Sequence, residues 1–291
     1  VVDGQVTRTI VQENVLSQLG AHSSNAHPAL AMLDSQHVLL AYNSGASPYL
    51  NIAVYDLTTK QPSITAQTTI SLPADISYLC AVALSSTKVA LAWRHDSLNY
   101  PQVCAIQIND TTITAGAPFT AAGPIGIVHL HAFSETQFLL VSSSSNVGST
   151  YYIPFTVNDN LSCTQGTYQT VSGGFNPSYL ARSENFGEGV AAVVFPTAST
   201  PKAAFVQLTG SGSAATVTVS DVTGSYNAQS CAIIKTGDDT FIWGTIYYNS
   251  GTSGGRTRWA TVTIDGTALN VGTWYDTTTL TCGYQIGRAH V

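Results

Sequence analysis

Charged residues are scarce in this 291-residue sequence. Lys, Arg, Asp and Glu together make up 9% of it, and the formal net charge is −6. A chain with so few cations has no extended basic surface with which to bind nucleic acid or an anionic membrane. No apolar run approaches the length of a membrane span either. We therefore predict neither a nucleic-acid partner nor a membrane-spanning segment.

Cysteine is also sparse, and its spacing is irregular. The number of cysteines is odd and no C-x-x-C pair occurs, so the sequence does not suggest a zinc site or a disulfide framework. Small apolar side chains in a core are the expected role of isolated cysteines. We predict this role for Cys80, Cys104, Cys163, Cys231 and Cys282.

The sequence is rich in short β-strand patterns that recur at a fixed distance. In Lys88–Arg94, large apolar residues alternate with alanines, so both faces of this strand are expected to be covered. The equivalent strands are separated by 51, 49, 52 and 51 residues, and they begin at Val38, Val89, Phe138, Val190 and Phe241. A period near 50 residues with four short strands is typical of a β-propeller blade. We predict an all-β fold, a β-propeller with five complete four-stranded blades.

The repeat also sets the expected domain organisation. Single strands at residues 5–15 and 279–285 belong to partial blades, so six or seven blades are expected in the intact ring. The last six residues, Ile286–Val291, resemble a translated sequencing adapter, which limits the predicted propeller fragment to residues 1–285. Two immunoglobulin-like sandwiches would suit the length but would show no repeat near 50 residues. The complete blades are predicted at residues 28–70, 78–119, 127–170, 178–221 and 229–275.

One face of the predicted disc carries the longer loops, such as Ser142–Thr150, and is the expected functional face. Tyr49, Tyr100 and Tyr151 begin successive third strands at this face, 51 residues apart, and Lys202 follows one step later. A tyrosine ring can stack on a sugar and offer it a hydroxyl group. These tyrosines are therefore the candidate ligand-binding residues. The alternative interpretation is that they wedge between blades.

Patterns for catalysis and metal binding are weak. His129 and His131 share one face of a strand, but no third ligand follows at a recognisable spacing, so we predict a packed or channel-lining pair. A propeller glycosidase needs at least two carboxylates on its inner strands, and Glu184 is the only acidic residue near that place. We predict no catalytic residue, no metal site, no cofactor and no enzymatic activity. A glycoside hydrolase is the alternative.

Ser85–Arg94, the polar loop after it and Val103–Gly116 together resemble the repeat of bladed β-propeller proteins from phage tail fibres and secreted bacterial proteins. The resemblance extends over residues 1–285 and carries over no catalytic residue. It implies a virion or extracellular protein that binds a cell-surface glycan or a protein receptor, with a possible homo-oligomer in a virion. A purely structural virion protein is the alternative. As an open arc, residues 1–285 alone are expected to aggregate or oligomerise.

Overall fold

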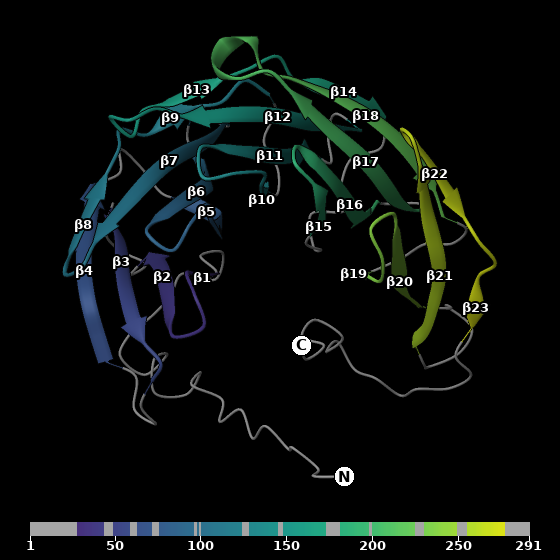
Figure 1. The fold of residues 1–291 in the computed structure, drawn as a ribbon, viewed down its shortest axis with the longest axis horizontal. Helices are drawn as coiled ribbons and strands as arrows, with labels where there is room; N and C mark the ends of the chain where they lie inside the picture. Colours follow the sequence, from purple (N-terminus) through teal and green to yellow (C-terminus); the bar gives the residue numbers. More distant parts are fainter. Residues whose placement is uncertain are drawn as a thin grey trace.

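The computed structural model describes most of the chain and shows five blades in an arc around a central opening (Figure 1). The predicted end strands at 5–15 and 279–285, and the last six residues, lie outside the described residues. The structure describes residues 28–43, 49–58, 63–71, 76–95, 98, 100–123, 128–144, 148–172, 181–197, 200–224, 230–248 and 255–276.

Each blade is one antiparallel sheet in which the strands follow one another in chain order. The first strand of each blade lies at the central opening and the fourth lies at the periphery (Figure 1). In blades two, three and five the last strand is divided into two short pieces, which both pair with the third strand.

The first two blades consist of β1 (Ala29–Met32), β2 (His37–Asn43), β3 (Tyr49–Asp56) and β4 (Ser63–Ser71), then β5 (Ile76–Ala83), β6 (Lys88–His95), β7 (Tyr100–Asn109), β8 (Thr112–Ala115) and β9 (Phe119–Thr120). The third blade consists of β10 (Val128–Ala132), β11 (Gln137–Ser144), β12 (Ser149–Val157), β13 (Cys163–Gln165) and β14 (Gln169–Ser172). The last two consist of β15 (Arg182–Gly187), β16 (Val190–Pro196), β17 (Pro201–Thr209) and β18 (Thr216–Thr223), then β19 (Ser230–Lys235), β20 (Thr240–Tyr248), β21 (Gly255–Asp265), β22 (Ala268–Val271) and β23 (Tyr275–Asp276).

These sheets confirm the predicted β-propeller with five complete four-stranded blades. The described residues contain no α-helix, and one short 3₁₀ turn, Gly212–Ala214, precedes β18. The described part of the chain also has no helix long and apolar enough to cross a membrane.

The core consists of apolar layers between neighbouring blades, and β6 shows how the sequence builds them. Leu91 and Trp93 point toward the first blade, where they pack in one cluster with Ile52. Ala90 points the other way and packs in a second cluster with Phe138 of the third blade. All but Ile52 of these side chains are fully buried, and Ile52 is 1% exposed. A strand that is apolar on both faces therefore serves two interfaces at once.

The sequence predicts one continuous fourth strand in each blade, over Thr111–Phe119, Leu161–Thr170 and Thr267–Tyr275 in blades two, three and five, whereas the structure divides these three strands. A Cβ atom at Gly116, between β8 and β9, would lie 2.1 Å from the Leu161 carbonyl oxygen of the third blade. A Cβ atom at Gly166, between β13 and β14, would lie 2.2 Å from the Ala215 oxygen of the fourth blade. At these two interruptions, in blades two and three, the main chain of the next blade thus comes so close that only glycine leaves room for it.

The first strand of the fourth blade is also shifted relative to the prediction. The sequence predicts this strand over Ser178–Arg182, whereas β15 runs from Arg182 to Gly187 and pairs with β16 from Val194 to Val190. The residues of β15 are mostly polar, so they lack the apolar alternation by which a strand is recognised. As a result Arg182, Ser183 and Glu184 all belong to the inner wall of the propeller.

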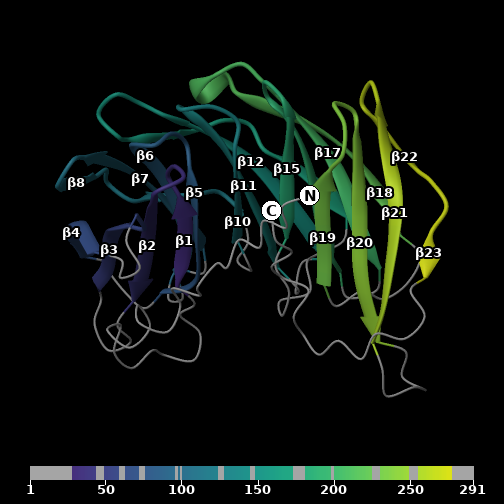
Figure 2. The ribbon, with the colours of Figure 1, turned by 60° about the horizontal axis from the view of Figure 1, so that its bottom comes forward.

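Alternate hairpins open on opposite faces of the disc because neighbouring strands are antiparallel. We call the face where the third strands begin the loop face; Tyr49 and Tyr100 mark it on the first two blades. The opposite face, here the turn face, carries the turns between first and second strands and between third and fourth strands. Figure 2 shows the tips of the β17–β18 and β21–β22 hairpins on the turn face.

Candidate functional site

Two of the three predicted tyrosines lie exposed at the loop face. Tyr49 is the first residue of β3 and Tyr100 is the first residue of β7, so they occupy equivalent places on neighbouring blades. Their exposed fractions are 44% and 47%, although most of the residues that follow in each strand are buried. The blades thus present two accessible aromatic rings on rigid strand ends.

Tyr151 has a different environment. It is only partly buried, but its ring lies 5.7 Å from the ring of Tyr168 and packs against the core between the second and third blades. Lys202, the next residue in the row, reaches across a blade interface: its ammonium group lies 2.6 Å from Asp221 and donates to the Ser172 carbonyl oxygen at 2.6 Å. These two positions therefore join blades, as the alternative interpretation of the row expects.

The two histidines on β10 form a hydrogen-bonded seam with the fourth blade. His129 Nε2 and His131 Nδ1 both lie 2.9 Å from the hydroxyl oxygen of Ser183 on β15. One serine hydroxyl can donate to one ring and accept from the N–H of the other, so both rings can be neutral. The His131 ring also meets Phe133 edge-on, with 5.1 Å between centroids.

This seam is a poor nucleophilic centre. Burial lowers the pKa of His129 to about 3, and the nearby His131 and Arg182 add to that effect. Burial lowers the pKa of His131 to about 4. A general base works best with a pKa near the operating pH. Neutral rings with such low pKa values would remove a proton from Ser183 only weakly.

The carboxyl group predicted to be nearest the inner strands, that of Glu184, lies in the middle of β15. Burial raises its pKa, whereas the charge of Lys235 on β19 lowers it. The Lys235 ammonium group donates to the Asn185 carbonyl oxygen at 3.2 Å and lies 5.0 Å from the Phe186 ring centroid. On the described inner strands Glu184 is the only carboxylate, so a second carboxyl for glycoside hydrolysis does not lie beside it there.

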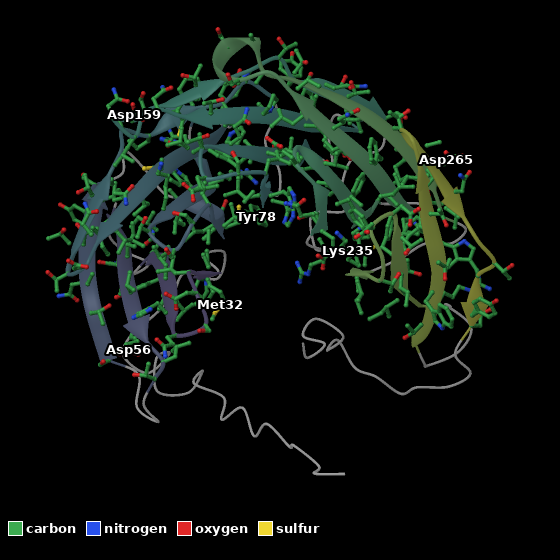
Figure 3. The ribbon with its side chains drawn as sticks, in the orientation of Figure 1. Met32, Asp56, Tyr78, Asp159, Lys235 and Asp265 are labelled. Atoms are coloured by element: carbon green, nitrogen blue, oxygen red, sulfur yellow. The ribbon has the colours of Figure 1, made fainter. Side chains whose placement is uncertain are left out.

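Tyr78 is an inner-wall residue that the sequence does not single out. Its φ is +53°, in the left-handed region that bulky residues rarely adopt, and it sits in the register shift between Ser77 and Cys80. The guanidinium carbon of Arg94 lies 5.9 Å from its ring centroid. Figure 3 shows Tyr78 and Lys235 at the central opening. A strained main-chain conformation cannot be recognised from composition or spacing, so the sequence did not identify Tyr78 as a candidate.

The two faces of the disc differ in charge. Most of the described acidic residues lie in the turns of the turn face or next to them: Asp34, Asp56, Asp110, Glu135, Asp159, Glu188, Asp238, Asp239 and Asp265. The described cations lie on both faces: Arg94, Arg182, Lys202 and Arg258 are near strand ends at the loop face, and Lys88 and Lys235 are at strand ends on the turn face. Among the described residues the negative charge is therefore concentrated on the face opposite the exposed tyrosines.

The candidate metal-ligand residues do not gather into a site. In the part of the chain that the structure describes, no group of three His, Cys, Asp or Glu side chains could hold an ion. Cys104, Cys163 and Cys231 are buried, Cys80 is partly buried, and none of these four forms a disulfide. Cys282 lies outside the described residues.

The comparisons with known proteins concern the fold. The sequence matches no protein-family model and no curated protein. A crystal structure of a protein from Lactobacillus plantarum is similar with a TM-score of 0.56 at 13% identity, covering 88% of this chain and 72% of that one. The WD40 domain of SCAP from fission yeast matches with a TM-score of 0.36 at 9% identity, covering 83% of this chain and 74% of that one. The chain is a β-propeller, and at these identities the likeness extends to the fold alone.

Proposed function

We propose that this chain is a non-enzymatic recognition propeller that binds a surface glycan through its loop face. In this proposal the propeller belongs to a phage tail or an extracellular bacterial protein. The observation that carries the proposal is the pair of exposed rings, Tyr49 and Tyr100, at equivalent strand ends of neighbouring blades. An aromatic ring offers a flat apolar surface together with a hydroxyl group, which suits the alternating faces of a sugar.

The rigidity of the scaffold supports the proposal. The strands behind both tyrosines pack in buried layers, so a ligand would have to order only the two side chains and not the main chain that carries them. The inner wall supports a binding role over hydrolysis, because Glu184 is the one carboxylate on the described inner strands. Function thus rests on surface side chains rather than on an acid–base pair.

A glycan array with the full chain and three variants tests the proposal. We expect the Tyr49→Ala/Tyr100→Ala double variant to lose about tenfold or more in affinity, since each aromatic contact contributes about 0.5–1.5 kcal/mol. Adding Tyr151→Ala should weaken binding little further but lower the melting temperature, because Tyr151 packs in a blade interface.

The matched control is Tyr275→Ala, which removes an equally accessible tyrosine, 52% exposed, from the peripheral strand β23. This control should bind like the original chain. Unchanged binding by a folded Tyr49→Ala/Tyr100→Ala variant would refute a role of the loop-face tyrosines. Release of reducing ends from a bound polysaccharide, abolished by Glu184→Gln, would replace recognition with hydrolysis.

A further inference from the structure

Arg182 has an unusual position for a charged side chain. It is the first residue of β15, the innermost strand of the fourth blade, and therefore lies at the loop-face end of that strand. Figure 1 shows β15 at the central opening. The side chain is partly buried, and its Nη1 donates a hydrogen bond to the carbonyl oxygen of the adjacent Ala181 at 3.0 Å. A guanidinium group has five N–H donors, so most of them have no partner among the residues that the structure describes.

No carboxylate balances this charge within the described residues. The ion pairs there join other partners: Asp34 with His37, Asp221 with Lys202, and Asp276 with Arg258. Glu184, two residues along the same strand, interacts electrostatically with Lys235 instead. A partly buried cation without a counter-charge is unfavourable for folding.

The groups around Arg182 are neutral and polar. Burial raises the pKa of the Cys231 thiol on β19 to about 12, so this neighbour is uncharged. His129, across the seam on β10, is neutral as well, and burial together with nearby charges keeps its pKa at about 3. His131 is 7% exposed, and its Nε2 is buried with no hydrogen-bond partner among the described residues. Burial lowers the pKa of Arg182 itself, as expected for a cation in a site without a counterion.

We propose that Arg182 binds an oxyanion, the carboxylate, phosphate or sulfate group of a ligand that enters the central opening from the loop face. The planar guanidinium fork matches such groups in a bidentate manner, and the neutral imidazole of His129 lies close enough to Arg182 to interact with it electrostatically. The acidic turn face repels anions and leaves the loop face as their approach. This site is separate from Tyr49 and Tyr100 and goes beyond the proposed glycan contact there.

Titration of the full chain, followed by NMR of the histidine ring signals, tests the site. The probes are D-galacturonate and inorganic phosphate, with D-galactose as a neutral sugar that differs from galacturonate by the carboxylate. We expect saturable shifts of the His129 and His131 signals with at least one anion and none with galactose. Single His129→Gln and His131→Gln variants assign the signals.

Three arginine variants show whether Arg182 is the anion-binding group. Arg182→Gln should weaken anion binding at least tenfold, and Arg182→Lys, which keeps the charge but loses the fork, should weaken it several-fold. Arg258→Gln is the matched control, because Arg258 already pairs with Asp276 on the periphery, and it should bind as the original chain does. Equal anion affinity of the Arg182→Gln variant, or the absence of saturable shifts with either anion, would overturn the proposal.

Thermal unfolding without ligand separates a binding role from a structural one. Removing a partly buried charge that has no counter-charge should leave the melting temperature of Arg182→Gln unchanged or raise it. Adding the anion should then raise the melting temperature of the original chain but not that of the variant. A ligand-free Arg182→Gln variant that melts many degrees lower would identify Arg182 as a folding residue and contradict the proposal.

Discussion

The histidine seam between the third and fourth blades should make the propeller sensitive to mild acid. His129 and His131 are held neutral in the folded protein, with pKa values of about 3 and about 4, against 6.5 for an ordinary histidine. At a pH between the folded and unfolded pKa values, these two histidines are protonated in the unfolded chain but remain neutral in the folded protein. The two histidines therefore do not reduce the free energy of unfolding above about pH 6.5, and they reduce it progressively as the pH falls from 6.5 toward 4.

The size of the effect follows from linkage. At pH 5 an unfolded histidine is almost fully protonated, whereas His131 in the fold is mostly neutral, so His131 alone lowers the free energy of unfolding by about 2 kcal/mol. His129 acts in the same direction. Burial raises the pKa of Glu184, so acidification protonates this group more readily in the folded protein than in the unfolded chain. Glu184 therefore partly offsets the stability that the histidines lose. Against a typical total of about 5–15 kcal/mol, the loss from the seam is readily measured.

Urea unfolding at pH 7.5 and pH 5.0 measures this loss. The free energy of unfolding of the original chain should decrease between pH 7.5 and pH 5.0. For His131→Gln this decrease should be smaller by about 2 kcal/mol. His37→Gln is the control, because His37 is only partly buried at the start of β2 and bonds to Asp34 in the preceding turn, outside the seam. An effect common to all histidines would therefore appear in this variant too. An equal loss in His131→Gln and the original chain would refute the reasoning.

Two further predictions concern packing. Gly116→Ala should lower the free energy of unfolding by about 1–3 kcal/mol or more, because the new Cβ would lie 2.1 Å from the Leu161 carbonyl oxygen, a main-chain atom that cannot rotate away; urea unfolding measures it. Trp93→Ala should cost about 3–5 kcal/mol, since Trp93 is fully buried and its indole N–H donates to Gln102 at 3.0 Å; an equal midpoint of unfolding in variant and original would contradict this.

The architecture could be predicted because the physics of a blade is local and repeats. Each second strand must be apolar on both faces, since it contacts two neighbouring blades, and Lys88–Arg94 shows that pattern directly. Short turns with Asp, Ser and Gly separate the strands, and their regular distance sets the blade length. Period and alternation together were therefore sufficient for fold class and blade number among the described residues.

The details that failed depend on contacts between blades. The split at Gly116 follows from the approach of another blade's main chain, which no local pattern encodes. The polar strand β15 forms because β16 offers it a partner, not because its own residues prefer a strand. Likewise, the partner of His129 and His131 is Ser183, more than 50 positions away, and only the blade arrangement brings them together.

The same limit applies to the candidate sites. Tyr100 and Tyr151 are indistinguishable by spacing, yet Tyr100 is exposed and Tyr151 packs beside Tyr168. The sequence gives the position of a residue in the repeat, whereas its neighbours from other strands decide whether it can reach a ligand. Arg182 is the opposite case: the sequence did not suggest it as a binding residue. Only the structure shows that no carboxylate pairs with it among the described residues.

The distribution of charge connects the two proposed sites. Strand ends at the loop face hold the exposed tyrosines and Arg182, whereas the turns of the opposite face hold most of the described carboxylates. Under the two proposals, a ligand with a negative group is repelled by the turn face and binds at the loop face, so the field orients its approach before any contact forms. A neutral sugar would bind through the aromatic rings alone, and the electrostatic field of the protein would not orient it. Added salt should consequently weaken the binding of an acidic ligand at Arg182 while leaving stacking on Tyr49 and Tyr100 nearly unchanged.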